Sequence, residues 1–431
     1  MSLYVQNIFA LADANNFYVS CEGNFNPRLR NRPVIVLSNG DGCVVARNQM
    51  SKDLGIKMGQ PVFQIKDLIM KNGVVALSSN YALYADMSNR FMNVLSCYSP
   101  QVEVYSVDES FLYLNGNVGN WDSLTSMGAT IKNHVAKWTG LPICIGFAPT
   151  KTLAKLSNHI AKKNPSYKGV CDLTGMDSHQ VKEILSKIDV SEVWGVGRKL
   201  SAHLINMNIQ TVQDLKQASP KALRERFGVV MERTIEELNG VSCLELSEIA
   251  PPRKQIVSSK SFGTKVSTRD ELEQSVSDYI ATASEKLRNQ NSTCGAVQVF
   301  IMTDRFREDE PQYYNTYTIP LPEPTNDVRI LTSVAVWGLK KIYLDGYKYK
   351  KSGVCLTDLQ ECGIKQGSLF DTGMERRNSA ELMTAFDSLN KQFGRGTIKI
   401  GSSMGHNRYK MRFDRKTPCY TTDWNELPRL I

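Results

Sequence analysis

Short strand-forming segments end in acidic residues at two places, and this pattern constrains the fold most. The apolar run from Ile8 to Leu11 leads into Asp13, which predicts a buried strand that ends in a turn or a site. Strands are expected at 102–107 and 111–114, with Asp108 and Glu109 at the polar tip between them. Successive strand residues point to opposite faces, so Asp108 and Glu109 share a site only because the chain turns there.

Carboxylates gathered at strand ends suit phosphoryl-type transfer. That chemistry needs two divalent ions about 3.5 to 4 Å apart, which bridge the attacking oxygen and the leaving phosphate oxygens. Carboxylate oxygens are hard ligands that suit Mg²⁺. Taken singly, Asp13 or Asp108 is better explained as a turn residue, because aspartate is common in turns. Cations placed to hold a triphosphate are what favour the metal site.

Composition limits the class of protein. The 431 residues exceed the size at which one hydrophobic core stops growing, so three or four domains are expected. Lysine and arginine exceed aspartate and glutamate by 52 to 43, which fits a polyanionic partner as well as an ordinary basic surface. The ten cysteines form no C-x-x-C pair and the five histidines lie away from them, which predicts free thiols in a reducing cytoplasm and no structural zinc. No apolar stretch approaches the roughly 20 residues that span a bilayer, so no membrane contact is expected.

The order of predicted elements indicates an α+β protein with a helical part in the middle. A strand is expected at 33–37, a helix at 151–163 with Thr150 as its N-cap, and only helices from 178 to 240. After a proline-rich linker at 251–254, strands at 256–262, 296–302, 314–319 and 353–356 alternate with helices at 271–290 and 328–342. This βαββαβ order predicts a ferredoxin-like sheet with both helices on one face. Beyond Leu359 the one periodic segment is 380–393, which predicts a partly flexible extension.

Four segments together resemble a known family. The sequences at 9–22 (FALADANNFYVSCE) and 105–111 (YSVDESF) resemble the two catalytic motifs of Y-family DNA polymerases. The sequences at 38–48 (SNGDGCVVARN) and 78–88 (SSNYALYADMS) are similar to those of the UmuC type, the catalytic subunit of bacterial DNA polymerase V. The resemblance implies a right-hand polymerase with a palm (1–21 and 80–175), fingers (22–79), a helical thumb (176–248), a little finger (253–358) and a C-terminal extension (359–431).

The resemblance also assigns roles in the nucleotide site. It implies that Asp13, Asp108 and Glu109 are catalytic and hold two Mg²⁺ ions, with help from the carbonyl of Ala14. Nucleotide-binding positions are Phe17, Tyr18, Lys52 and Lys162, and the ring of Tyr18 would collide with a ribose 2′-hydroxyl. The chain departs from the family in one respect: many members have a Tyr-x-x-Arg pair in the fingers, where this sequence has Gln49 and Lys52. Lysine does not grip phosphate in the bidentate way that arginine does.

Two further motifs point to macromolecular partners. The loop at 194–199 (WGVGRK) resembles a helix-hairpin-helix, in which Gly195 and Gly197 let the backbone approach a DNA phosphate while Arg198 and Lys199 add charge. The same G-x-G is also explained as a tight turn. The peptide QGSLF, with Gln366, Leu369 and Phe370, resembles the motif that docks polymerases to the bacterial sliding clamp. Such a short pattern arises often by chance, and its position after the little finger favours docking.

These features lead to a specific functional hypothesis. The chain is expected to be a DNA-directed DNA polymerase for error-prone translesion synthesis in the DNA-damage (SOS) response of a bacterium, acting in the cytoplasm at the nucleoid. Its expected partners are primer-template DNA, a dNTP, the sliding clamp, a dimer of processed UmuD and a RecA filament. The alternatives are a catalytically inactive DNA-binding scaffold and a nucleotide cyclase. Intact acids disfavour the scaffold, and a cyclase needs neither a thumb loop nor a clamp peptide.

Overall fold

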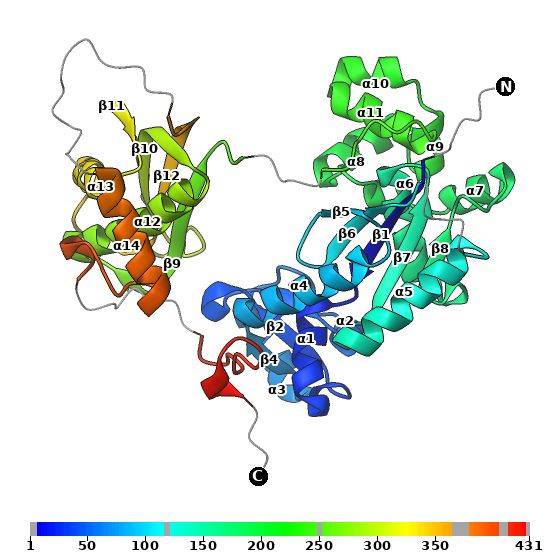
Figure 1. The fold of residues 1–431 in the computed structure, drawn as a ribbon, viewed down its shortest axis with the longest axis horizontal. Helices are drawn as coiled ribbons and strands as arrows, with labels where there is room; N and C mark the ends of the chain where they lie inside the picture. The colour runs from blue at the N-terminus through cyan, green and yellow to red at the C-terminus, as the bar shows by residue number, and fades with distance from the viewer. Residues whose placement is uncertain (1–6, 116–120, 248–251, 364–378, 405–412, 428–431) are drawn as a thin grey trace. The chain divides into compact units, whose positions relative to one another are not determined.

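The chain folds into two compact units and passes between them twice. The computed structural model describes residues 7–115, 121–247, 252–363, 379–404 and 413–427. The first unit contains residues 1–250 and 414–431, and the second contains residues 251–413 (Figure 1). No helix among the described residues is both long enough and apolar enough to cross a membrane. All ten cysteines lie in described parts of the chain, and each is a free thiol.

The larger sheet of the first unit has the strand order β5-β6-β1-β7-β8, and its two faces carry different helices. Ala10 and Ala12 belong to the hydrophobic core shared with α4 and α5, whereas Phe9 and Leu11 belong to the core shared with α6. Alternation along β1 therefore places Asp13 on the α6 face. The elements are β1 (Phe9–Ala14), α4 (Tyr81–Ser96), β5 (Gln101–Val104), β6 (Glu109–Tyr113), α5 (Leu124–Thr139), β7 (Ile143–Ala148), α6 (Lys151–Lys163) and β8 (Val170–Asp172).

Helix α6 lies unusually close to the sheet because β7 has a glycine beneath it. A Cβ at Gly146 would stand 2.1 Å from the backbone nitrogen of Asn158. The Asn158 side chain donates hydrogen bonds to the carbonyls of Leu11 (3.1 Å) and Cys144 (2.8 Å), so it ties α6 to both β1 and β7. Thr150 is the N-cap of this helix, as the sequence predicts. These contacts fix the height and rotation of α6 over the end of β1.

A small sheet and a group of helices complete the first unit. The sheet has the order β3-β2-β4, with β2 and β4 parallel, and has its own small hydrophobic core. The helices after β8 confirm the helical part expected from 178 to 240. The elements are α1 (Phe17–Phe25), β2 (Val34–Leu37), β3 (Val44–Arg47), α2 (Gln49–Asp53), α3 (Lys66–Lys71), β4 (Val75–Ser78), α7 (Ser178–Leu185), α8 (Arg198–Ile205), α9 (Val212–Gln217), α10 (Pro220–Phe227) and α11 (Val229–Leu238).

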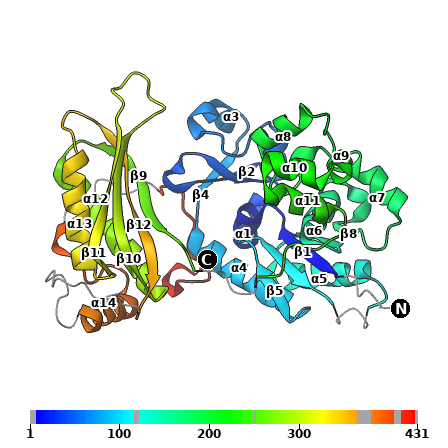
Figure 2. The ribbon, with the colours of Figure 1, turned by 90° about the horizontal axis from the view of Figure 1, so that it is seen from above.

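The second unit has the βαββαβ element order that the sequence predicts, but not the predicted strand order. Helices α12 and α13 lie side by side on one face of an antiparallel sheet with the order β11-β10-β12-β9 (Figure 2). The last strand, β12, lies between β9 and β10, where a ferredoxin-like sheet has the third strand, so that part of the prediction was wrong. The elements are β9 (Ile256–Val266), α12 (Arg269–Asn289), β10 (Ser292–Thr303), β11 (Tyr314–Thr325), α13 (Val328–Ile342) and β12 (Tyr349–Glu361).

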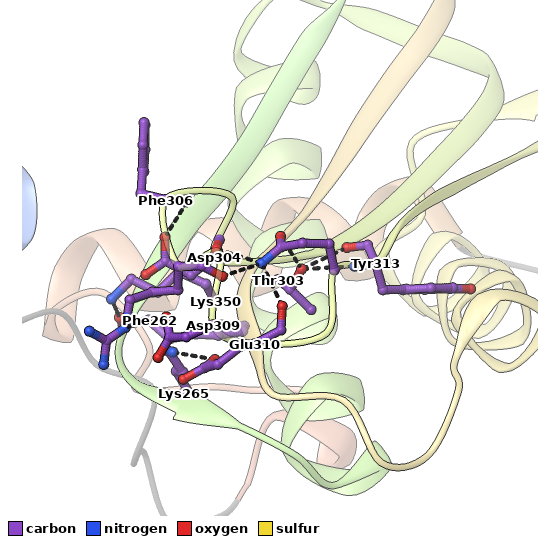
Figure 3. A network of polar contacts seen from close by, with 11 residues as sticks. Phe262, Lys265, Thr303, Asp304, Phe306, Asp309, Glu310, Tyr313 and Lys350 are labelled. Carbon is purple, nitrogen blue, oxygen red and sulfur yellow. Dashed lines mark hydrogen bonds and ion pairs between the residues drawn. The ribbon is translucent and has the colours of Figure 1, made fainter.

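The loop between β10 and β11 is folded on itself. The side-chain amide of Gln312 donates to the carbonyls of Asp304 (3.1 Å), Arg307 (2.7 Å) and Glu310 (3.1 Å). Lys265 of β9 lies 2.5 Å from the Glu310 carboxylate, and Figure 3 shows this pair within the polar network around the loop. The connection therefore has a defined conformation although it contains no regular element.

The described parts of the C-terminal region pack on the two units, whereas the expectation of a partly flexible extension stays a prediction. Helix α14 (Ser379–Phe393) confirms the predicted helix and packs on the second unit. Met383 is 2% exposed in that unit's core, and Asp387 pairs with Arg288 of α12 at 2.6 Å. Residues 414–427 instead belong to the first unit. Sequence patterns miss such packing because the partners lie far away in the chain.

Candidate active site

The fold brings the three predicted acids together. Asp13 lies directly opposite Glu109 in the antiparallel register of β1 and β6. The backbone N–H of Ala14 donates to the carbonyl of Asp108 at 2.8 Å, which joins the end of β1 to the hairpin. Glu109 is the first residue of β6 rather than part of the turn, and alternation places it with Phe111 on the α6 face. Asp13 and Glu109 therefore face the same helix.

Each acid is paired with a cation or a hydroxyl group. Lys162 Nζ lies 2.5 Å from Asp13 Oδ2, and Lys155 Nζ lies 3.1 Å from Glu109 Oε2. These two lysines are seven residues apart, about two helical turns, so they share one face of α6. Ser106 Oγ donates to Asp108 Oδ1 at 2.6 Å.

The electrostatics of Asp13 reflect this crowding. Burial raises the pKa of Asp13 to about 7, Lys162 acts against the rise, and the charges of Glu109 and Asp108 add to it. Ionised carboxylates this close repel one another, and a nearby cation relieves that repulsion.

The donor set fits divalent metal ions in its chemistry. Among the described residues, no three acidic, histidine or cysteine side chains are already arranged as ligands of one ion. Lysines and a serine contact one carboxylate oxygen of each of the three acids. Carboxylate oxygens are nevertheless the ligands that Mg²⁺ prefers. The site thus has suitable donors, and its lysines supply positive charge in their present positions.

Tyr18 is held in a cluster of aromatic rings next to the acids. Asn16, two residues before Tyr18, has a φ of 50°, which lets the chain turn sharply from β1 into α1. The Tyr18 ring stacks on Tyr84 of α4 with centroids 4.3 Å apart and meets the edge of Tyr81 at 6.1 Å. Burial raises the pKa of Tyr18, and the charges of Tyr81 and Asp108 add to the rise. Phe17 is 3% exposed as a whole residue and belongs to the hydrophobic core of the first unit.

Several cations from different elements face one another beside the acids. Lys52 of α2 has a lowered pKa, first because of burial and then because of the charges of Arg47, Lys162 and Lys163. The structure therefore brings together Lys52 and Lys162, which the sequence predicts as nucleotide-binding. Arg47 and Lys155 were missed as site residues. Their positions in the sequence could have indicated both residues. Arg47 ends a strand within a family motif, and Lys155 shares a helix face with Lys162.

The predicted DNA-binding loop is connected to the acidic hairpin. Gly195 has a φ of 88°, a left-handed conformation that favours glycine, and Gly197 is the N-cap of α8. Arg198 and Lys199 are exposed in the first turn of α8. The preceding Trp194 donates from Nε1 to the Tyr105 hydroxyl at 3.0 Å. The expected clamp-binding residues Gln366, Leu369 and Phe370 lie outside the described residues.

Family comparisons match most of the chain. The impB/mucB/samB family matches residues 12–159, and that family's C-terminal domain matches residues 253–369. A domain of unknown function matches residues 380–430. In this structure the last of these regions is divided, because α14 packs on the second unit and residues 414–427 pack on the first.

Individual relatives agree with this result. Protein UmuC of Salmonella typhimurium is 44% identical over 424 residues, covering 98% of this chain and 100% of that protein. DNA polymerase IV of Desulfatibacillum aliphaticivorans is 24% identical over 398 residues, covering 91% of this chain and 96% of that one. Among solved structures, a Y-family DNA polymerase chimera of Dbh and Dpo4 has a TM-score of 0.64 at 22% identity, covering 82% of this chain and 99% of the other. That likeness shows the fold.

Proposed function

Because the chain belongs to the impB/mucB/samB family and is a Y-family, DNA-directed DNA polymerase, we propose that it performs error-prone translesion synthesis in the SOS response. The observation that carries the proposal is the meeting of the three acids with a group of cations: Asp13 and Glu109 stand opposite each other beneath two lysines of α6. This arrangement suits a nucleoside triphosphate whose α-phosphate lies near the acids. We place this activity in the bacterial cytoplasm, at the nucleoid.

The acids take the metal-binding role in this proposal. Asp13, Asp108 and Glu109, with the carbonyl of Ala14, would hold two Mg²⁺ ions, which supply charge neutralisation and Lewis acidity when bound. The primer 3′-hydroxyl attacks the α-phosphate of the dNTP, a new P–O bond forms, the bond to pyrophosphate breaks, and the hydroxyl proton passes to solvent water. When the triphosphate binds, Lys162 gives up its contact with Asp13 and contacts the phosphates instead, since its ammonium group already lies at the site.

The cations and the aromatic cluster bind the rest of the nucleotide. Lys52, Arg47 and Lys162 offset the negative charge that develops on the leaving pyrophosphate. Tyr18 lies beneath the sugar, where its ring excludes a 2′-hydroxyl. Its stacking on Tyr84 supports this role, because a ring that excludes an atom must itself be held in place.

The domains and partners follow the same proposal. Residues 1–21 and 80–175 form the palm, 22–79 the fingers, 176–248 the thumb and 253–358 the little finger. The loop with Gly195, Gly197, Arg198 and Lys199 contacts the DNA backbone without reading sequence. The peptide with Gln366, Leu369 and Phe370 tethers the enzyme to the sliding clamp and so raises its effective concentration at the primer end. A dimer of processed UmuD and a RecA filament are the remaining proposed partners.

Primer extension tests the proposal directly. The full-length chain and its Asp108→Asn variant are incubated with Mg²⁺ and four dNTPs on undamaged and abasic-site templates, alone and with RecA and processed UmuD. We expect extension past the lesion that is lost in the variant. Extension only on undamaged template would refute the translesion role. DNA binding without extension under any condition would favour the inactive scaffold.

A further inference from the structure

The C-terminal segment Asp414–Leu427, here called the C-terminal strap, packs on α1 and on the start of α4. Ser78 N–H donates to the carbonyl of Arg415, and Arg415 N–H donates to Ser78 Oγ, both at 3.1 Å. The ring of Tyr420 stacks on Phe25 of α1 with centroids 4.9 Å apart and planes 9° apart. The strap is drawn in red in Figure 1. The strap lies within the region that matches a domain of unknown function.

Asn80 anchors the strap to the N-terminus of α4. Its side chain is fully buried and donates to the carbonyls of Thr417 and Pro418, each at 3.0 Å. The oxygen of the same amide accepts a hydrogen bond from Leu83 N–H, which makes Asn80 the N-cap of α4. One side chain therefore fixes both the strap and the helix that carries Tyr84.

Glu22 links the strap to Tyr84 directly. Glu22 is 1% exposed as a whole residue, and its Oε1 accepts hydrogen bonds from the Tyr84 hydroxyl (2.6 Å) and the Thr417 hydroxyl (3.1 Å). Burial raises the pKa of Glu22, and these two hydrogen bonds act against the rise. A buried carboxylate depends on such donors, and removal of one leaves it poorly satisfied. Thr417 is therefore part of what keeps Glu22, and with it Tyr84, in place.

From these contacts we infer that the C-terminal strap positions the sugar-selecting ring of Tyr18. Thr417 holds Glu22, Glu22 holds the hydroxyl of Tyr84, and the ring of Tyr84 stacks on Tyr18 at 4.3 Å. Thr417 is a positioning residue, because it acts through Glu22 and Tyr84 and touches no substrate. The inference rests on the proposed role of Tyr18 and adds to it the strap as a determinant of sugar selection.

The test compares incorporation of dNTP and rNTP by full-length variants, in the primer-extension mixture that supports the unaltered chain. Thr417→Val keeps the side-chain shape and removes the hydroxyl. The Thr417 hydroxyl donates to Glu22 Oε1 and also accepts from Asn80 Nδ2 at 3.1 Å, so this variant loses two hydrogen bonds. Because one hydrogen bond contributes roughly two- to tenfold, we expect the preference for dNTP to fall by at least about twofold, with little change in dNTP use. Thr417→Ser restores the hydroxyl and should restore the preference. Thr422→Val, at an exposed threonine of the same strap, is the matched control and should have no effect.

Tyr84→Phe removes the same hydrogen-bonded link from its other end. We expect it to lower the preference too, and the double variant with Thr417→Val to lose less than the product of the single losses. If Thr417→Val fails to fold, Tyr84→Phe carries the test together with Thr417→Ser. If Thr417→Val and Tyr84→Phe both leave the preference for dNTP unchanged while Tyr18→Ala accepts ribonucleotides, the inference about the strap is wrong and the proposed role of Tyr18 still stands. If Tyr18→Ala also leaves the preference unchanged, the proposed role of Tyr18 itself fails.

Discussion

Removing one charge of the buried pair Lys151–Glu103 should destabilise the first unit far more than removing both. Lys151 Nζ lies 2.6 Å from Glu103 Oε2, and the side chains are 5% and 10% exposed. The same carboxylate oxygen accepts a hydrogen bond from Ser247 N–H at 2.6 Å, so the pair joins β5, the start of α6 and the segment that leaves the unit. Breaking a buried pair leaves an uncompensated charge in a poorly solvated place.

The magnitude follows from these contacts. Loss of one partner of a buried ion pair costs about 3 to 5 kcal/mol. Lys151→Met should lie near the lower limit, about 3 kcal/mol, because Ser247 N–H still donates to the remaining carboxylate. The double variant Lys151→Met/Glu103→Gln leaves no unpaired charge and keeps an acceptor for Ser247. It should cost about 1 kcal/mol, the net contribution of an ordinary hydrogen bond.

Native-state hydrogen exchange of the amides in α6 measures this cost for the first unit alone, because the two units of the chain can unfold in separate transitions. The exposed pair Lys187–Glu183, with side chains 71% and 60% exposed, is the control, and its loss should cost less than about 0.5 kcal/mol. The reasoning is refuted if the stability lost in the double variant equals the sum of the losses in Lys151→Met and Glu103→Gln, to within about 0.5 kcal/mol.

Three further predictions concern packing, acid stability and DNA binding. Gly146→Ala should destabilise the first unit by about 3 kcal/mol, because the new Cβ would meet the backbone of α6, and a lowered melting temperature would report it. Burial opposes ionisation of Asp327, yet hydrogen bonds from Arg329 and Ser379 outweigh it and lower the pKa of Asp327 to about 2. The stability that ionised Asp327 contributes is fully present above the unfolded pKa near 3.8 and is lost as the pH falls through 2. Asp327→Asn should therefore cost about 1 to 2 kcal/mol of stability at pH 7 and little at pH 2. Urea titrations at both pH values would show the difference. The logarithm of DNA affinity should fall by about 0.9 per neutralised phosphate for each unit of log salt, and the double change Arg198→Ala/Lys199→Ala should reduce that slope by about 2 in a fluorescence titration.

Local patterns predicted the parts of the site that depend on local geometry. Alternation along a strand places Asp13 with Phe9 and Leu11, and an N-cap threonine starts α6 where expected. Within the hairpin, the boundary was displaced, because Glu109 pairs across the sheet with Asp13 and so belongs to β6. The residues of the site were suggested by family motifs, and the structure adds which lysine faces which acid.

Long-range packing was not predictable from the sequence. The strand order of the second unit depends on pairing between distant segments, which periodicity does not encode. The strap has neither helical nor strand periodicity, and its hydroxyl at Thr417 meets a carboxylate 395 residues earlier in the chain. The position of Arg47 beside Lys52 likewise depends on how β3 and α2 pack rather than on their own composition.

The packing of the strap makes the first unit dependent on the order of synthesis. The segment that supplies Glu22 with its second donor leaves the ribosome long after the acids and Tyr18, because Thr417 lies 395 residues beyond Glu22. A nascent or prematurely terminated chain that ends before Asp414 can assemble every residue of the nucleotide site but lacks the group that steadies it. If Tyr18 depends on the strap as proposed, sugar selection is weaker in chains that lack the strap, and proteolysis before Asp414 would weaken it without touching the three acids.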